Sequence, residues 1–252
     1  MTATTPADPT IALVTGANKG IGREIATQLA ELGMTVLLAA RDPERGARAA
    51  AELRSLGHDA HPLTLDVTST RSVETAAAEV DDRFGRLDVL VNNAGVPGDL
   101  ATQRPATASV DTVRAVFETN VFGVIRVTTA LLPLLSRSPA GRIVNLSSGV
   151  GSLTRMSDPA DYLYRLPASA GYVPSKTALT ALTVQYAKEL RGTGILVNAA
   201  DPGACATDFT APLGRAISRT AADGAAVAVR LATLGPDGPT GGLFNDAGPV
   251  PW

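Results

Sequence analysis

Tyr172 and Lys176 are the residues of this chain whose types and spacing most directly suggest proton chemistry. They stand four positions apart, so a helix places both side chains on one face. A free phenol has a pKa of about 10, too high for an effective base at neutral pH. A neighbouring ammonium favours the phenolate and lowers that pKa. The pair therefore predicts a tyrosine that gives and takes a proton, although Tyr-x-x-x-Lys also occurs by chance.

Two adjacent hydroxyls, Ser147 and Ser148, come directly after the apolar run at residues 142–146. We expect that run to be a buried parallel strand. Ligands of open α/β sheets bind at the carboxyl ends of the strands, where these serines would lie. Either hydroxyl could hydrogen-bond a substrate carbonyl there.

A glycine-rich string, Thr15-Gly16-Ala17-Asn18-Lys19-Gly20-Ile21-Gly22, stands between an expected strand at 11–14 and an expected helix that Gly33 ends. Gly16 permits a tight turn, while Gly20 and Gly22 let the backbone approach a phosphate at the helix N-terminus. This context predicts a dinucleotide site. The spacing is G-x-x-x-G-x-G rather than the general G-x-G-x-x-G, and an ordinary glycine loop is the alternative.

The residues after the second expected strand indicate which dinucleotide binds. NAD sites usually carry an acidic residue there that binds the ribose hydroxyls. Here Arg41 occupies that point and Asp42 comes one place later. A planar guanidinium suits a 2′-phosphate, and Lys19 would add a second cation. The pair favours NADPH/NADP+, with solvated surface cations as the alternative.

Apolar runs alternate with helical patterns along the whole chain, as in a doubly wound parallel sheet. Expected strands cover residues 11–14, 35–40, 62–65, 87–91, 142–146, 195–199 and 242–244. Expected helices cover the segment after the glycines and residues 43–56, 70–84, 109–135, 172–191 and 221–234. The pattern predicts an α/β fold with about seven strands in a single domain, residues 1–252.

Composition excludes several classes of function. The chain has 252 residues, 45% of them hydrophobic, and a net charge of −2, which gives no electrostatic case for nucleic acid or an anionic membrane. A single cysteine excludes a disulfide framework. His58 and His61 could form a metal pair, but a surface pair is favoured and no metal is expected. The first nine residues lack a signal pattern and no apolar run approaches membrane length, so we expect a soluble cytoplasmic protein.

Together these motifs resemble the short-chain dehydrogenase/reductase superfamily over nearly the whole chain, and within it the carbonyl reductases. The markers are TGANKGIG at 15–22, Asp66-Val67, Asn92-Asn93-Ala94-Gly95, Asn120, Ser147-Ser148, Tyr172-x-x-x-Lys176, Pro202-Gly203 and Thr207. The resemblance implies a single-domain Rossmann fold. The narrower likeness depends on the Asn-Lys-Gly turn, Ala40-Arg41-Asp42 and the terminal Trp252.

The resemblance also implies a role for each marker. Ser148 is the catalytic serine and Ser147 is structural, while Asn120 holds a water that links Lys176 to solvent, or merely satisfies backbone. Asp66 and Val67 contact the adenine, and Thr207 the carboxamide or a phosphate. The full set expected to bind the cofactor is Gly16, Asn18, Lys19, Gly20, Ile21, Gly22, Arg41, Asp66, Val67, Asn93, Ala94, Gly95, Tyr172, Lys176, Pro202, Gly203 and Thr207.

The function so implied is NADPH-dependent reduction of a ketone or aldehyde, with Asn120, Ser148, Tyr172 and Lys176 as the catalytic set. Two alternatives stay open: a dehydrogenase working mainly in alcohol oxidation, and a catalytically silent NADPH-binding sensor. The partner is a small carbonyl or alcohol compound. Residues 203–220 are expected to form the substrate-binding loop, with Cys205 as a pocket wall rather than a nucleophile.

An insertion at residues 153–170 separates Ser148 from Tyr172 by more than in most short reductases. Asp158-Pro159 predicts a helix start, and Tyr162, Leu163 and Leu166 would form its apolar face. The insertion could cap the outer face of the Tyr172 helix, where many short reductases pair, or act as a lid over the substrate. Capping narrowly favours a monomer over a homodimer or homotetramer.

Overall fold

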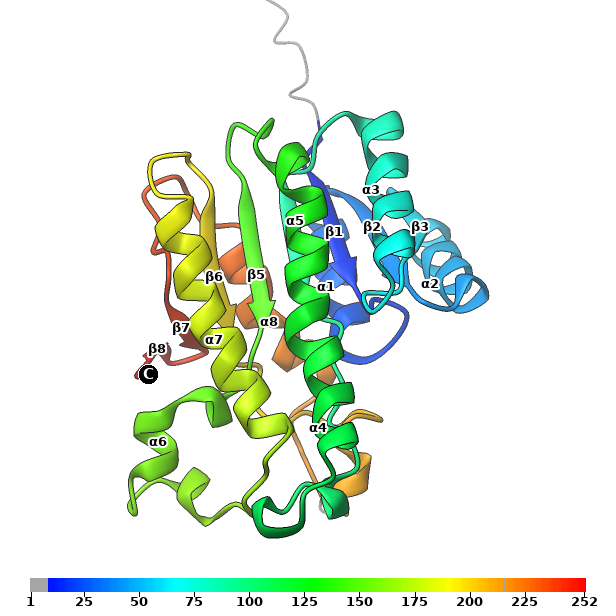
Figure 1. Ribbon diagram of the computed structural model, residues 1–252. Coiled ribbons are helices and arrows are strands. Elements are labelled where there is room, and N and C mark those ends of the chain that lie inside the picture. Colours follow the sequence, from blue (N-terminus) through cyan, green and yellow to red (C-terminus); the bar gives the residue numbers. More distant parts are fainter. Residues whose placement is uncertain (1–8, 215) are drawn as a thin grey trace, which may run out of the picture.

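Eight strands form one sheet, and helices cover both of its faces in the computed structural model (Figure 1). The model describes residues 9–214 and 216–252. The expectation of no signal pattern therefore falls largely outside the described residues, as does residue 215 of the expected substrate loop.

The strand order is β3-β2-β1-β4-β5-β6-β7-β8, and every pairing is parallel except that of β7 with β8. The strands are β1 Ile11–Thr15, β2 Thr35–Ala40, β3 Ala60–Thr64, β4 Val89–Asn92, β5 Arg142–Leu146, β6 Leu196–Ala200, β7 Leu243–Asn245 and β8 Gly248–Val250. This confirms the doubly wound fold. The expected count of seven missed β8, a three-residue strand too short for hydrophobic alternation to reveal.

The helices follow the strands in alternation. They are α1 Gly20–Glu31, α2 Pro43–Ser55, α3 Thr70–Phe84, α4 Val110–Phe117, α5 Gly123–Leu135, α6 Leu153–Ser157, α7 Tyr172–Glu189 and α8 Ala221–Ala232. One π-helical segment, Glu118–Phe122, joins α4 to α5, so the helix expected over 109–135 is present but interrupted in its middle.

Side chains that alternate along each strand enter two separate cores. On β1, Val14 packs with α1, α2 and α8 on one face, whereas Leu13 packs with α3, α5 and α7 on the other. Both faces of the sheet are therefore buried, which is why the strands read as continuous apolar runs.

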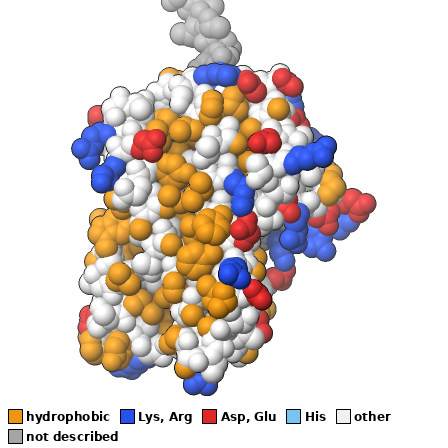
Figure 2. Space-filling view, in the orientation of Figure 1, with side chains coloured by type: hydrophobic (Ala, Val, Ile, Leu, Met, Phe, Trp, Pro, Cys, Tyr) orange, Lys and Arg blue, Asp and Glu red, His pale blue; other side chains and the backbone are white. Residues whose placement is uncertain are grey.

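The helical stretch Val110–Leu135 corrects one expectation, because its length and its mean hydropathy of 1.3 would suffice to cross a membrane. In this fold 44% of the 18-residue apolar window within this stretch is buried inside the protein, where α5 packs on β4 and α3. Its outer side leaves Phe122 and Ile125 exposed, 46% and 36% respectively. Figure 2 shows hydrophobic side chains gathered over this face, where α5 and α7 lie in Figure 1.

The insertion folds differently from its expected helix. Its helix, α6, ends just before Asp158, whose carboxylate accepts the amide N–H of Ala160 and turns the chain. A single 3₁₀ turn, Tyr162–Arg165, follows, with Asp161 as its N-cap. Asp161 also pairs with Arg155 at 2.7 Å, which holds the insertion against itself.

Candidate active site

The predicted site residues meet at one edge of the sheet, at the carboxyl ends of β1, β4, β5 and β6 (the lower end in Figure 1). The chain leaves β1 toward β2 on one side, whereas β4 lies on its other side. β1 is therefore the topological switch point of the sheet, and ligands of such sheets usually bind at the carboxyl ends of the strands there.

The glycine turn after β1 is fastened to the turn after β4. Gly16 and Gly20 have φ of +65° and +57°, a region that favours glycine. The Thr15 hydroxyl oxygen accepts the amide N–H groups of Asn93 and Ala94, both at 3.0 Å. Asn93 Nδ2 donates to Thr15 O at 2.8 Å. The Asn93 side chain thus shapes the turn expected to hold the cofactor.

Helix α1 begins without a side-chain cap. Its N-cap residue, Lys19, provides no side-chain hydrogen bond, and its first turn contains no acidic residue. Gly22 is packed so closely that a Cβ would lie 2.2 Å from Asn93 Nδ2. Free N–H groups at a helix start, reached through glycines, fit the pyrophosphate of a dinucleotide.

The residues after β2 fit a 2′-phosphate better than a ribose diol. The Asp42 carboxylate accepts the amide N–H groups of Glu44 and Arg45 and caps α2, so it is already occupied. Arg41 is exposed, and among the described residues no hydrogen bond or ion pair engages its guanidinium. Lys19 instead pairs with Asp208 at 2.8 Å.

Tyr172 is the first residue of α7 and its hydroxyl is hydrogen-bonded to Ser148. Burial raises the pKa of the phenol to about 12, which outweighs the lowering by the Ser148 bond. The phenol therefore carries its proton at neutral pH. The expected lowering of this pKa is not seen, because the cost of removing the phenolate from water dominates.

Lys176 lies beside Tyr172 as expected, with Nζ 5.7 Å from the centre of the phenol ring. The Lys176 ammonium donates to Leu146 O at 2.6 Å. Its side chain is only 5% exposed, and burial lowers its pKa to about 8. Burial thus makes the charged form of Lys176 energetically unfavourable, a feature common at functional sites.

The two serines take separate positions. The Ser147 hydroxyl is buried and lies 2.8 Å from Thr180 Oγ1, with a second bond to Lys176 O. Ser148 is half-buried and touches Tyr172. The Ser147 hydroxyl is thus used inside the protein, whereas the Ser148 hydroxyl lies against the Tyr172 phenol.

Asn120 lies in the π-helical segment and is 1% exposed. Its Nδ2 donates to Val96 O and to Ser175 Oγ, both at 3.0 Å, and its Oδ1 accepts the amide N–H of Val96 at 2.9 Å. Both amide donors are therefore used inside the protein. The side chain thus ties α7 to the turn after β4, and its expected role in holding a water stays a prediction.

Asp66 and Val67 follow β3, two strands from β1 in the sheet. Asp66 Oδ1 accepts the N–H and the hydroxyl of Thr68, and Val67 is 8% exposed. A Cβ on Gly95 would lie 3.7 Å from Lys176 Nζ, so the turn after β4 borders the Tyr172–Lys176 pair.

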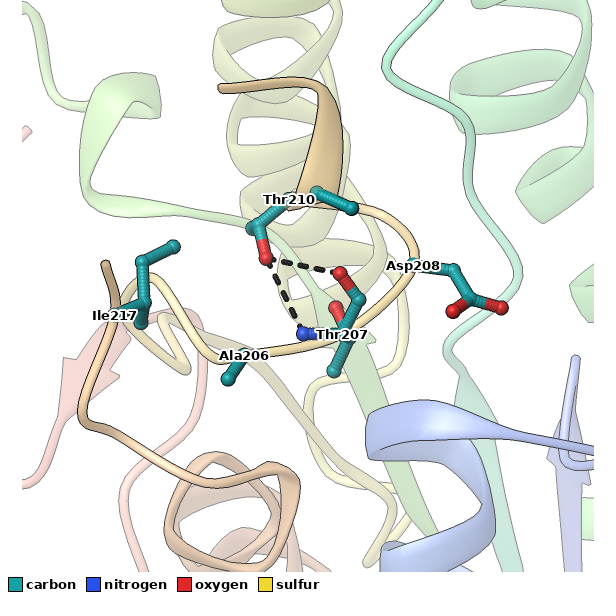
Figure 3. Close-up of a pocket in the computed structure, with 6 residues that line it drawn as sticks. Ala206, Thr207, Asp208, Thr210 and Ile217 are labelled. Atoms are coloured by element: carbon teal, nitrogen blue, oxygen red, sulfur yellow. Dashed lines mark hydrogen bonds between the residues drawn. The ribbon is translucent and has the colours of Figure 1, made fainter. Parts of the chain in front are cut away.

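The segment from 203 to 214 covers the glycine turn, since a Cβ on Gly20 would lie 3.7 Å from Thr207 Cγ2. The Thr210 hydroxyl accepts the amide N–H of Thr207 and donates to its carbonyl, while Asp208 points out of the loop (Figure 3). A pocket of about 340 Å³ opens in this loop, lined by Ala206, Thr207, Asp208, Thr210, Ala211 and Ile217.

Cys205 does not line that pocket, which corrects the expectation. It is 1% exposed, and its thiol packs on α8, where a Cβ at Gly224 would lie 2.5 Å from Sγ. Burial raises the pKa of the thiol. The cysteine is therefore a buried packing residue beneath the loop.

An apolar cavity of about 380 Å³ lies beside the Tyr172 phenol. Its lining residues are Pro97, Gly98, Asp99, Leu100, Ala101, Phe209 and Pro212. The Phe209 ring packs on the Tyr172 ring with centroids 5.6 Å apart. Phe209 and a buried glutamine, Gln103, were not singled out from the sequence. Phe209 could have been found from its place two residues after Thr207, but Gln103 gave no local signal.

Comparison with known proteins shows the family to which this chain is similar. The family model described as short chain dehydrogenase matches residues 10–218. A short-chain dehydrogenase of Penicillium roqueforti, anuI, is 38% identical over 230 residues, 89% of each chain. The 3-oxoacyl-[acyl-carrier-protein] reductase FabG of Staphylococcus aureus is 38% identical over 200 residues, which span 79% of this chain and 76% of that one.

Solved structures show the same fold. A variant of actinorhodin polyketide ketoreductase, determined with NADPH, has a TM-score of 0.82 at 32% identity and covers 97% of this chain and 98% of its own. The NADPH-bound carbonyl reductase from chicken fatty liver has a TM-score of 0.82 at 28% identity and covers 96% and 98%.

Proposed function

We propose that this chain, which belongs to the short-chain dehydrogenase family, reduces ketones or aldehydes to alcohols with NADPH. The observation that carries the proposal is the Tyr172 phenol, which is hydrogen-bonded to Ser148 and lies beside the Lys176 ammonium. A proton donor next to a hydroxyl donor, at the mouth of an apolar cavity, suits a carbonyl oxygen that gains negative charge.

The cofactor proposal combines this chain's residues with its relatives. The open start of α1 would hold the pyrophosphate, and Arg41 and Lys19 the 2′-phosphate. The ketoreductase and the carbonyl reductase named above were both solved with NADPH. Bound NADPH would supply the hydride.

The chain's own residues would do the rest of the chemistry. The Ser148 and Tyr172 hydroxyls are in hydrogen-bond contact, so one substrate oxygen can accept from both. Tyr172 then gives its proton to that oxygen. Lys176, charged below about pH 8, stabilises the phenolate that remains. Asn120 holds the π-helical segment against Ser175 and so steadies α7.

A panel of ketones and aldehydes, assayed by NADPH oxidation, tests the proposal. We expect turnover with NADPH and much less with NADH. A protein that binds NADPH but consumes none with any carbonyl compound would be a sensor. Turnover found only with alcohols and NADP+ would favour the oxidative alternative.

The preference for a monomer depended on the insertion capping α7. The insertion instead lies at the lower end of α7 in Figure 1, with Tyr162 61% exposed, and the apolar face over α5 and α7 is open (Figure 2). This arrangement supports pairing through that face. Light scattering coupled to size exclusion tests this pairing. A mass near 25.8 kDa, that of one chain, would favour the monomer instead.

A further inference from the structure

Gln103 is a fully buried amide that joins two segments of the candidate site. It lies in the segment after β4, at 0% exposure. Its Nε2 donates to Pro97 O at 2.7 Å. Its Oε1 accepts the Ser169 hydroxyl at 2.8 Å and the amide N–H of Tyr172 at 2.7 Å. Its backbone carbonyl also accepts the Ala170 N–H at 2.7 Å.

These bonds complete the start of α7. The N-cap of that helix is Gly171, which provides no side-chain cap, so the first N–H groups need partners from elsewhere. Gln103 Oε1 caps the N–H of Tyr172, the residue that carries the phenol. A Cβ on Gly171 would lie 2.5 Å from Oε1, and one on Gly98 would lie 2.7 Å from Nε2. Both glycines therefore leave room for this side chain.

The two ends of the amide face different parts of the site. The acceptor end holds the backbone of Tyr172, and the donor end holds Pro97, which lines the apolar cavity beside the Tyr172 ring. A single rigid side chain thus fixes the distance between the proton donor and the wall of the cavity.

We propose that Gln103 is a positioning residue for carbonyl reduction, which sets Tyr172 through its acceptor and the cavity wall through its donor. This inference depends on the proposed function. Displacing a reacting group by about 1 Å can cost about 100-fold in rate. Losing the acceptor should therefore lower kcat, whereas losing only the donor should raise KM.

Two variants separate these effects. Gln103→Met keeps the size of the side chain but removes both its hydrogen-bond acceptor and its donor. We expect its kcat to fall about 10- to 100-fold. Gln103→Glu keeps an acceptor for the Tyr172 N–H but loses the donor to Pro97. For it we expect kcat within about threefold of wild type and KM raised about fivefold or more. Both should bind NADPH like wild type.

A matched control is Asn198→Leu. Asn198 is 1% exposed and likewise binds two backbone groups. Its Nδ2 donates to Pro239 O at 2.7 Å and its Oδ1 accepts the amide N–H of Gly242 at 3.1 Å, in the segment ahead of β7. The Asn198→Leu variant should lower the melting temperature as Gln103→Met does, yet leave kcat and KM close to wild type.

Equal kcat in Gln103→Met and wild type would overturn the inference, as would a Gln103→Glu enzyme that loses kcat with KM unchanged. If Gln103→Met does not fold, the split between kcat and KM in Gln103→Glu decides alone. A wild-type protein that reduces no carbonyl compound would instead overturn the proposed function, so the two failures are distinguishable.

Discussion

Helices α1 and α7 both begin at the carboxyl edge of the sheet without a side-chain cap of their own, yet their first turns are completed differently. At α1 the N-cap is Lys19, which provides no side-chain cap, and the first turn holds no acidic residue. At α7 the N-cap is Gly171, and Gln103 from a distant segment closes the helix start. One start is open and the other is filled by the protein.

The difference follows from what each helix start has to do. An open N-terminus can receive the phosphates of a cofactor, which complete it on binding. A closed N-terminus holds its own first residue in place before any ligand arrives, and that residue is Tyr172. The comparison predicts that changes at α7 affect chemistry and changes around α1 affect cofactor binding.

Replacing Tyr172 with Phe should produce the largest effect. The variant loses the only proton donor that we assign and should lose about 10²- to 10⁴-fold in kcat. NADPH affinity, measured by fluorescence, should stay near wild type, because only one hydroxyl of the expected cofactor contacts is lost and the start of α1 is unchanged. Tyr186→Phe, farther along the same helix, is the control and should keep its activity. A Tyr172→Phe enzyme with near-normal turnover would remove Tyr172 from the mechanism.

Replacing Lys176 with Met should stabilise the fold while lowering activity. The pKa of Lys176 is about 8 in the folded protein against an ordinary value of 10.5, so between these pH values only the unfolded chain holds the proton. Stability therefore rises with pH across this window. Below pH 8 the buried ammonium costs about 3 kcal/mol, an upper estimate. Removing it should raise the free energy of unfolding by up to that amount.

Thermal unfolding at pH 7 and near pH 10.5 measures this directly. The gain of Lys176→Met over wild type should be present at pH 7 and shrink toward zero at the higher pH. Lys188→Met, an exposed change on the same helix, should show neither effect. A Lys176→Met protein that is less stable at pH 7 would mean that the bond to Leu146 outweighs desolvation.

The contrast between the two helix starts also explains what the sequence could predict. The α1 start is local: strand, glycines and helix are contiguous, so this strand–turn–helix unit could be predicted from residues 11–33. The α7 start depends on Gln103, 69 positions earlier in the chain. No periodicity or motif links such residues. The pKa of Tyr172 was missed for a similar reason, since burial depends on the whole fold and not on the spacing to Lys176.

Around α1, replacing Arg41 with Asp should weaken NADPH. The variant loses a charge-assisted pair and adds repulsion toward the 2′-phosphate, which we expect to raise Kd about 10- to 100-fold. Asp42 cannot compensate for NADH by moving, because it caps α2. NADH should therefore gain little. Arg191→Asp makes the same charge change at the far end of α7 and should leave NADPH binding unchanged. Equal catalytic efficiency with NADPH and NADH in the wild type would contradict the assignment.

The smallest expected effect tests how open the α1 region is. The exposed ion pair between Lys19 and Asp208 holds the cation that we assign to the 2′-phosphate, and Lys19 lowers the pKa of that carboxyl. Asp208→Asn should free Lys19, so NADPH should bind about two- to fivefold more tightly at low salt, with the gain screened as salt rises. Asp111→Asn breaks another exposed pair, with Arg114, and should change nothing.

Weaker NADPH binding in Asp208→Asn would reverse this interpretation. The ion pair would then close the 203–214 loop over the bound cofactor, since Thr207 next to Asp208 already lies against Gly20. In that case α1 would be completed partly by the protein, as α7 is by Gln103. The sign of this small change therefore decides whether the ligand alone fills the first turn of α1.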